Sequence, residues 1–337
     1  MKNKTSNKDL SKARANKKDE FYTQLSDIEK ELKYYKEHFK NKIVYCNCDD
    51  PRVSNFFHYF SYNFEKLELK KLITTCYKNN DMDLFSQNSS ERAIYLEYTG
   101  DKNNNNIPDK EEIEINYLDG DGDFRSKECI ELLKQADIVV TNPPFSLFRE
   151  YVAQLIEYDK KFLIIGNINA ISYKEIFKLF KENKIWLGAS IHSGDREFGV
   201  PSYYPLNAAG VRVDEKGNKF IRVKGVRWFT NLDYKERHEN LILYKKNNPK
   251  DYPKFDNYDA INVDKTSDIP MDYEGAMGVP ITFLDKYNPE QFEIIGADYE
   301  VKEGLLPEII NPKWKVKLDR GYINGKRMYA RLLIKRK

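Results

Sequence analysis

The segment Asp137-Ile138-Val139-Val140-Thr141-Asn142-Pro143-Pro144-Phe145 is the most informative part of this chain of 337 residues. Its β-branched run predicts a short buried strand. The strand has to end at Asn142, because prolines cannot donate to a sheet and hold the residues before them in extended geometry. An amide, two fixed carbonyls and an aromatic ring are thereby placed at the carboxyl end of a strand. Open α/β sheets bind their ligands at that edge.

The tetrad Asn142-Pro143-Pro144-Phe145 suits chemistry on an amino group. The Asn142 side-chain oxygen and the Pro143 carbonyl can both accept hydrogen bonds from one exocyclic NH2. Two such acceptors make the nitrogen a better nucleophile, and the Phe145 ring can stack on the planar ring that carries it. The alternative interpretation is a Pro-Pro turn that ends a strand beside an incidental Asn and Phe.

The composition is that of a soluble globular protein, with 40% hydrophobic and 32% charged residues. The length suits one large domain, or a core with an appended module. No run of about 18 apolar residues occurs, and the polar start lacks a signal-peptide core, so we expect no membrane segment and a cytoplasmic location. A net charge of +3 does not predict nucleic-acid binding, which would need a local basic face.

Two features of the sequence could indicate a metal or redox site, but each has a simpler structural explanation. The four cysteines form no Cys-x-x-Cys pair and are expected to be buried thiols. The loop Asp101–Glu112 follows the spacing of an EF-hand calcium loop, but Asn106 stands in place of the usual glycine and predicted strands flank it. We therefore favour a polar hairpin loop between strands 94–98 and 112–117, with a metal site as the alternative, and predict no metal ligands.

The N-terminal part contains three segments of interest. Residues 1–19 carry seven Lys and Arg, which indicates either a solvated tail or an arm that contacts phosphates. Phe21-Tyr22-Thr23 precedes a helix expected over 27–40, with Ser26 and Glu29 as a capping box. A first strand over 42–47 ends at Asp49-Asp50-Pro51.

The rest of the chain alternates strands with helices, which predicts an α/β fold with a mostly parallel, doubly wound sheet. We expect the sheet to finish in an antiparallel hairpin that pairs 225–230 with 240–244.

The loop 192–205 and the rings of Trp228 and Phe229 are candidates to face a substrate, although core packing explains such rings equally well. Seven prolines break the tail 247–337 into short pieces, and a type I′ turn is predicted at 323–326.

The order of these segments resembles the γ group of amino-group DNA methyltransferases, whose catalytic tetrad is (Asp/Asn/Ser)-Pro-Pro-(Tyr/Phe/Trp). Over nearly its whole length the chain also resembles the EcoRI-type adenine-specific methyltransferases. The strings that carry this closer resemblance are Asp19–Gln24, Tyr45–Pro51, Gly120–Ser126, Thr141–Ser146, Arg227–Leu232 and Gly278–Leu284. One departure is the glycine-free stretch Arg52–Asn55, where the family has a Gly-rich turn.

The resemblance implies a Rossmann-like, seven-stranded S-adenosylmethionine-dependent methyltransferase sheet with helices on both faces. It implies an arm and cofactor-closing helix over 1–41, a catalytic domain over 42–246 and a β-rich target-recognition region over 247–337, although that region could instead be a structural cover. The implied catalytic residues are Asn142, Pro143, Pro144 and Phe145. The implied cofactor-binding residues are Phe21, Tyr22, Thr23, Asp49, Asp50, Pro51, Asp123 and Phe124.

The activity implied by the resemblance is methyl transfer from S-adenosylmethionine to N6 of an adenine flipped out of double-stranded DNA, as in a restriction–modification system. A monomer is expected, with any cognate restriction endonuclease acting independently and GAATTC as the first site to test. The tetrad also occurs in enzymes that methylate cytosine N4, RNA adenine or a protein glutamine, and a non-catalytic DNA-binding relative is a further alternative.

Overall fold

The computed structural model describes residues 21–48, 54–75, 93–109, 111–200, 210–315 and 319–337. Asp49, Asp50 and Pro51 therefore lie outside the described residues, as does the basic segment 1–19. Two compact units divide the chain: residues 1–177 with 187–233 form the first, and residues 178–186 with 234–337 form the second.

The first unit is built on a mixed sheet of the order β4-β3-β2-β1-β5-β6-β11-β7. Its strands are β1 Ile43–Cys46, β2 Lys71–Thr75, β3 Ile94–Tyr98, β4 Ile113–Tyr117, β5 Ile138–Thr141, β6 Lys161–Asn167, β7 Trp186–Leu187 and β11 Val226–Thr230. The strands β2, β1, β5 and β6 pair in parallel. The predicted α/β class is confirmed, but the sheet is mixed and not mostly parallel, because β3, β4 and β11 pair antiparallel. The described sheet also has eight strands where the resemblance implied seven.

The antiparallel part of the sheet differs from the sequence prediction in one place. The β3–β4 hairpin lies at one edge, as the alternation of 94–98 and 112–117 predicted. The other antiparallel strand, β11, pairs with β6 and not with 240–244. The strand predicted at 240–244 is wrong, because the side chains of Ile242 and Tyr244 are 86% and 64% exposed and the segment has no sheet to pack on.

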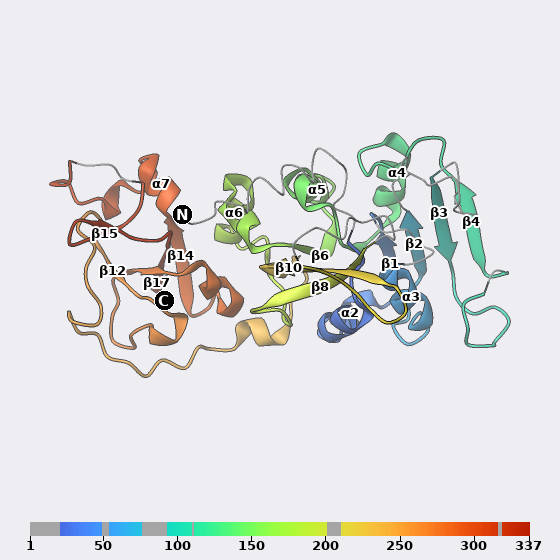
Figure 1. The fold of residues 1–337 in the computed structure, drawn as a ribbon, viewed down its shortest axis with the longest axis horizontal. Helices are drawn as coiled ribbons and strands as arrows, with labels where there is room; N and C mark the ends of the chain where they lie inside the picture. Colours follow the sequence, from blue (N-terminus) through green and yellow to red (C-terminus); the bar gives the residue numbers. More distant parts are fainter. Residues whose placement is uncertain (1–20, 49–53, 76–92, 110, 201–209, 316–318) are drawn as a thin grey trace. The chain divides into compact units, whose positions relative to one another are not determined.

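Helices cover both faces of the sheet, with α4 and α5 on one face and α2 and α3 on the other (Figure 1). The bounds are α2 Leu25–Leu32, α3 Asn55–Tyr62, α4 Lys127–Gln135, α5 Phe148–Glu157 and α6 Lys174–Lys181. Side-chain hydroxyls cap two of them: Ser54 accepts from the backbone of Phe56, and Ser126 accepts from Cys129. None of the described helices is long and apolar enough to span a membrane.

The helix predicted over 27–40 is shorter than expected. The predicted capping box is wrong. Helix α2 begins at Leu25, after an extended Gln24, so Ser26 lies within the first turn and does not cap the helix. The helix ends at Leu32, and a separate 3-10 turn covers Lys36–Phe39. The side chains of Ile28, Leu32, Tyr35 and Phe39 form the buried side of this segment and are fully buried.

A second, smaller sheet follows β7 in the first unit. It consists of β8 Asp195–Val200, β10 Lys219–Lys224 and β9 Val211–Val213, in that order and all antiparallel. The expectation of an irregular loop over 192–205 is therefore wrong for Asp195–Val200. Residues 201–209 lie outside the described residues.

The second unit is β-rich, as predicted for the tail. Its main sheet has the order β12-β13-β17-β14, with β12 Ala260–Asn262, β13 Ala276–Val279, β14 Phe292–Ala297 and β17 Leu332–Arg336, and helix α7 covers Asp298–Lys302. The hairpin of β15 Tyr322–Ile323 and β16 Lys326–Arg327 turns through Asn324 and Gly325 at φ 50° and 71°. Both angles are positive, so the predicted type I′ turn is confirmed.

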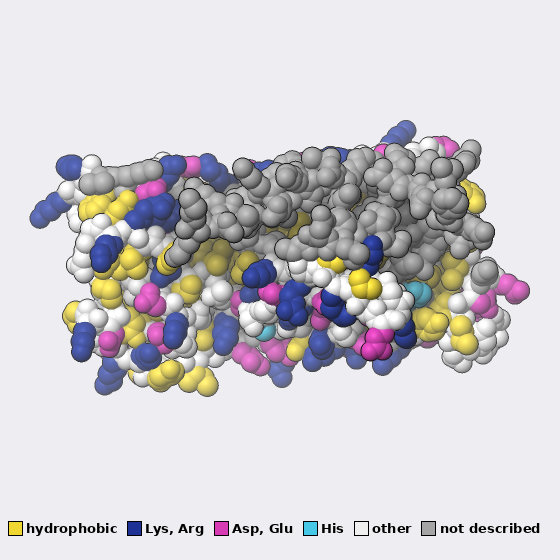
Figure 2. Space-filling model, viewed as in Figure 1, with side chains coloured by type: hydrophobic (Ala, Val, Ile, Leu, Met, Phe, Trp, Pro, Cys, Tyr) yellow, Lys and Arg dark blue, Asp and Glu magenta, His cyan; other side chains and the backbone are white. Residues whose placement is uncertain are grey.

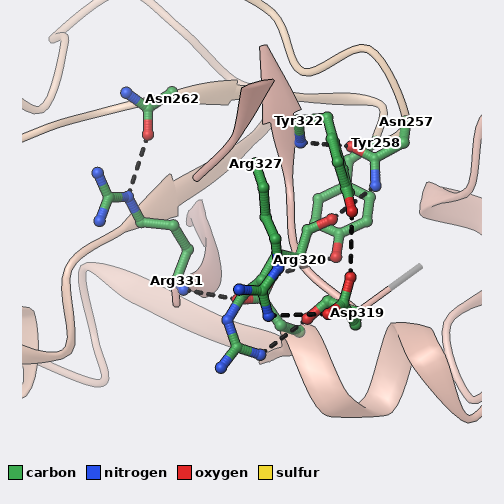
Figure 3. Close-up of polar contacts among 9 residues, drawn as sticks. Asn257, Tyr258, Asn262, Asp319, Arg320, Tyr322, Arg327 and Arg331 are labelled. Atoms are coloured by element: carbon green, nitrogen blue, oxygen red, sulfur yellow. Dashed lines mark hydrogen bonds and ion pairs between the residues drawn. The ribbon is translucent and has the colours of Figure 1, made fainter. Parts of the chain in front are cut away.

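A network of polar side chains joins several segments of this second unit, and Figure 3 labels Tyr258, Arg320 and Arg331 among them. Asp298 is 3% exposed and accepts hydrogen bonds from the Tyr258 hydroxyl at 3.1 Å and the Arg331 backbone at 2.9 Å. The Arg320 guanidinium lies 3.9 Å from the same carboxylate. Burial nevertheless raises the pKa of Asp298, because desolvation of the charge outweighs these contacts. The cluster has a structural explanation, since it joins β12, α7 and the chain leading into β17.

Candidate active site

The Asn142 side chain is held in one orientation at the end of β5. The residue is 6% exposed, and its Nδ2 donates to the Phe21 carbonyl at 2.6 Å. The hydrogen-bond network fixes which end of the amide is nitrogen, because only an N–H can face a carbonyl at that distance. Oδ1 therefore points away from Phe21 and accepts nothing from the described residues. The end of β5 therefore holds the Asn142 side-chain oxygen in one direction.

The ring of Phe145 belongs to a row of three aromatic side chains. Phe145 starts the 3-10 turn after Pro144, and its ring centroid lies 6.0 Å from that of Phe21 in an edge-on arrangement. On its other side, the Phe21 ring lies 5.8 Å from Phe198 of β8. Residues far apart in the sequence thus form one apolar wall beside Asn142.

The Phe21-Tyr22-Thr23 segment is fastened to the body of the first unit on two sides. Tyr22 and Gly199 of β8 exchange two backbone hydrogen bonds of 2.8 and 2.9 Å. The Asn55 side chain donates to the Thr23 carbonyl at 2.7 Å. The Thr23 hydroxyl is buried and has no hydrogen-bond partner among the residues described. A buried hydroxyl in this state indicates a position where a ligand could supply the missing partner.

The end of β1 is joined to the end of β5 through Asn47. Asn47 is 3% exposed, and its backbone carbonyl accepts a hydrogen bond from the Thr141 hydroxyl. Its side-chain oxygen accepts one from the Tyr151 hydroxyl of α5. Burial raises the pKa of Tyr151 well above its ordinary value, so that hydroxyl keeps its proton and remains a donor. The chain is thus firmly placed just before it reaches Asp49-Asp50-Pro51.

The Gly122-Asp123-Phe124 segment is fixed to α5, the helix that begins three residues after the tetrad. The Asp123 carboxylate accepts from the Arg125 guanidinium at 2.7 and 2.9 Å, and Arg125 also contacts Glu150 at 2.9 Å. The Phe124 ring is 6% exposed and packs edge-on against Tyr151, with centroids 5.0 Å apart. The Asp123 carboxylate therefore already accepts hydrogen bonds, and a ligand that donates to it would share it with Arg125.

Two of the residues that shape this site, Asn47 and Tyr151, were not singled out in the sequence as site residues. Asn47 belongs to a string that carries the family resemblance, whereas the contact of Tyr151 joins distant segments and leaves no local pattern. Phe198 and Gly199 lie in the 192–205 stretch suggested as a candidate to face the substrate, although their contacts with Phe21 and Tyr22 had no signal in the sequence. Trp228 and Phe229, suggested as substrate-facing rings, are fully buried and pack against Phe56 and Phe148. Their position supports the core-packing interpretation.

On the face shown in Figure 2, Lys and Arg side chains lie among Asp and Glu side chains. An open hollow of about 510 Å³ is lined by Gly194, Asp195, Glu197 and Arg222. Side chains alternate along a strand, so Glu197 lies on the opposite face of β8 from Phe198 and the aromatic row. Within the described ranges, no group of three or more His, Cys, Asp or Glu side chains is placed to hold a metal ion.

Comparisons with known proteins agree on one family. The family model for the adenine-specific methyltransferase EcoRI matches residues 9–337. The chain is 53% identical to the type II methyltransferase M.EcoRI of Escherichia coli over 339 residues, which covers 100% of this chain and 99% of that protein. It is 42% identical to the type II methyltransferase M.MgeORF184P of Mycoplasma genitalium and 40% identical to M.MpnI of Mycoplasma pneumoniae, with 97% of this chain and 98% of each relative covered.

Proposed function

This chain belongs to the EcoRI family of adenine-specific methyltransferases, and we propose that its Asn142 strand end methylates the N6 amino group of an adenine flipped out of duplex DNA. The relatives are type II methyltransferases, so the modification is site-specific and belongs to a restriction–modification system. The observation that carries the proposed mechanism is the hydrogen bond from Asn142 Nδ2 to the Phe21 carbonyl, because it aims Oδ1 outward before any substrate binds.

The proposed mechanism uses positioned acceptors and no strong base. Asn142 Oδ1 and the Pro143 carbonyl accept the two hydrogens of the adenine amine, which directs the nitrogen lone pair toward the methyl donor. The half-buried Phe145 ring stacks on the base. The proton leaves the amine after transfer. Preorganised acceptors of this kind account for factors of about 10²–10³ in rate.

Base flipping follows from where the acceptors lie. A base inside a duplex cannot reach a strand-end pocket, so the adenine has to rotate out of the stack at a cost of a few kcal/mol. The half-buried rings of Phe145 and Phe21 support this step, because an aromatic surface compensates part of the lost stacking, and the buried Phe198 ring packs against Phe21.

The described residues suit the methionine end of S-adenosylmethionine at the Phe21-Tyr22-Thr23 segment. When bound, that cofactor supplies an electrophilic methyl group on a positively charged sulfur. The unpartnered, buried Thr23 hydroxyl is the observation that supports a polar ligand there. Asp49, Asp50 and Pro51, at the adjoining end of β1, remain proposed partners of the ammonium.

At the other end of the proposed cofactor site, Asp123 would accept from the cofactor adenine amine, and Phe124 would line its ring. Arg125 already binds the Asp123 carboxylate through its side chain and its backbone N–H. A carboxylate has about four acceptor positions, so an additional donor can be accommodated without breaking that pair.

Target recognition is assigned by this proposal to residues 247–337. The β15–β16 hairpin supports it, because it exposes Lys326 and Arg327, and Tyr329 beyond it is 85% exposed. Cationic and aromatic side chains on a hairpin suit contacts with phosphates and base edges. We expect a monomer acting on double-stranded DNA, with any cognate endonuclease working independently.

The proposal is tested by Asn142→Ala. Methylation of duplex DNA should fall by about 10² or more, because one positioned acceptor is lost. Binding of S-adenosylmethionine, measured by calorimetry, should stay within about twofold of the wild type. Asn169→Ala, which truncates an exposed Asn in the same unit, is the matched control and should leave both quantities unchanged. Wild-type methylation rates in Asn142→Ala would overturn the proposed mechanism.

A further inference from the structure

The loop between β3 and β4 carries oxygen-bearing side chains at the spacing of a calcium loop. Asp101, Asn103, Asn105, Asp109 and Glu112 occupy what would be positions 1, 3, 5, 9 and 12 of an EF-hand loop. Glu112 is followed directly by β4. Two short strands, in place of the usual helices, hold the ends of the loop together.

The backbone removes the main objection to this comparison, which is the missing glycine at position 6. Asn106 occupies that position with φ 59°, and Asn104 has φ 58°. Asparagine is the residue other than glycine that adopts this left-handed conformation most readily. The backbone N–H groups of Asn105 and Asn106 donate to the Asp101 carboxylate at 3.2 and 2.7 Å, so the chain winds around its first acidic residue.

An independent indication of a missing ligand comes from Glu112. This residue is 2% exposed, and its Oε1 accepts hydrogen bonds from the backbone of Lys102 at 2.6 Å and Asn103 at 3.1 Å. These bonds aim the carboxylate into the beginning of the loop. Its Oε2 is buried and has no hydrogen-bond partner among the described residues. A buried, charged oxygen without a partner is costly, and a bound cation would satisfy it.

The negative charge of the loop also lacks a counter-charge. Asp101, Asp109 and Glu112 form no ion pair with any Lys, Arg or His that the structure describes. These carboxylates lie close enough to Tyr98 to act on its phenol together. With burial as the larger cause, and with Glu65 contributing, they raise the pKa of Tyr98 to about 12. The three carboxylates thus add negative charge to this end of the hairpin, and none of the Lys, Arg and His side chains that the structure describes pairs with them.

We propose that the loop Asp101–Glu112 binds one calcium ion. The ligands are the carboxylates of Asp101, Asp109 and Glu112, the side-chain oxygens of Asn103 and Asn105, and the Ile107 carbonyl. Calcium accepts six to eight oxygen ligands in flexible geometry and takes amide and carbonyl oxygens readily, whereas Mg²⁺ requires a near-ideal octahedron. The bound ion cross-links the β3–β4 hairpin and stabilises that edge of the sheet.

Calcium binding requires a local rearrangement of side chains, because some of the proposed ligands are hydrogen-bonded to one another. The Asn103 and Asn105 amides now donate through Nδ2 to the Asp109 carboxylate at 2.7 and 3.1 Å. Each amide therefore has to rotate so that its oxygen faces the ion, and Asp109 is released to become a ligand. The three carboxylates are not gathered around one point beforehand, which agrees with the absence of a three-carboxylate cluster among the described residues.

The test uses the full chain, treated with EDTA and exchanged into metal-free buffer. Calorimetry with CaCl2 should show one ion per chain with a Kd of about 10⁻⁵–10⁻³ M. At about 100 times the Kd, calcium should raise Tm by roughly 5 °C, and the same concentration of MgCl2 should raise it far less. Glu112→Gln should weaken calcium binding at least tenfold. Glu114→Gln removes the same charge from an exposed position two residues along β4 and should bind calcium as the wild type does.

Asp101→Asn provides a second variant, at a half-buried position, in case Glu112→Gln does not fold, and should also weaken binding at least tenfold. No heat of calcium binding to the wild type, or equal affinities in Asp101→Asn and Glu114→Gln, would overturn the proposal. The outcome is independent of the proposed methyl transfer, because calcium binding and Tm are read without DNA or cofactor.

Discussion

Two regions of the same sheet are rich in polar side chains. They differ in whether the hydrogen bonds of these side chains are completed within the protein. At the carboxyl ends of β1 and β5, Asn142, Thr141 and Tyr151 each donate a hydrogen bond to another group of the protein. In the β3–β4 loop, the Asp101 and Glu112 carboxylates receive only nearby N–H groups, and Glu112 Oε2 receives none from the described residues. The first region is already arranged for its substrate, whereas the second requires a cation to complete it.

Because of this difference, mutations in the two regions should have different consequences. A side chain in the first region fixes the direction of an acceptor, so its loss should lower a rate. A side chain in the loop holds charge that only an ion can neutralise, so its loss should change ion affinity and stability without changing methyl transfer.

The largest effect is expected from Asn142→Asp. The substitution would place an ionised carboxylate oxygen against the Phe21 carbonyl, where the Asn142 amide now donates at 2.6 Å. The new carboxyl must therefore keep a proton in order to fit, which raises its pKa. Methylation should be about 10² below the wild type at pH 8 and should recover as the pH falls toward that pKa. The pH–rate profile tests this, and a profile parallel to that of the wild type would show that Phe21 does not orient the side chain.

Loss of the Tyr151 hydroxyl should reduce stability. Tyr151→Phe leaves the buried side-chain oxygen of Asn47 without its donor, which costs about 1–3 kcal/mol of unfolding free energy. Urea unfolding measures the change. Tyr62→Phe is the control, since that ring is 61% exposed, and it should be neutral. Equal stabilities of the two variants would mean that Asn47 finds another donor.

A smaller effect on rate is expected from Phe198→Leu. The substitution keeps the volume of this buried position approximately and should cost less than about 1.5 kcal/mol of stability. It removes the ring against which Phe21 packs, so Asn142 should be held less firmly, and kcat should fall by about 3- to 10-fold with little change in KM for DNA. Phe162→Leu, at a buried position in β6, controls for general loosening of the core and should leave kcat unchanged.

The smallest effect on stability is expected from a substitution in the backbone of the Asp101–Glu112 loop. Asn106→Ala puts an alanine at φ 59° and should cost about 1 kcal/mol of stability, whereas Asn106→Gly should be neutral or slightly stabilising. Thermal unfolding of both variants in EDTA measures the difference. Identical Tm values would mean that the loop does not hold the left-handed conformation on which its winding around Asp101 depends.

Local chemistry made part of this structure predictable. Ile138–Val140 and the two prolines predicted a buried strand that ends at Asn142, because β-branching and the missing proline N–H act within a few residues. The type I′ hairpin at Asn324-Gly325 was predictable for the same reason, since only a few residue types accept positive φ. The alternation of 94–98 with 112–117 predicted the correct pairing of β3 with β4.

Other features depend on contacts that no local pattern contains. The hydrogen bond between Phe21 and Asn142 joins residues 121 positions apart. Strand β8 at Asp195–Val200 carries charges and a glycine, so its sequence resembles a loop, yet it pairs with β10 along its whole length. Conversely, the apolar run in Asn240–Tyr244 predicts a strand, but it pairs with none of the strands that the structure describes. Tertiary pairing overrode local propensity at both places.

The most direct test of the proposed methyl transfer is modified-base sequencing of DNA from cells that express this chain, beside cells that express Asn142→Ala. The account predicts N6-methyladenine at one recurring site in the first sample, with GAATTC as the first site to examine, and its near absence in the second. N4-methylcytosine, DNA without modification, or equal N6-methyladenine in both samples would contradict it.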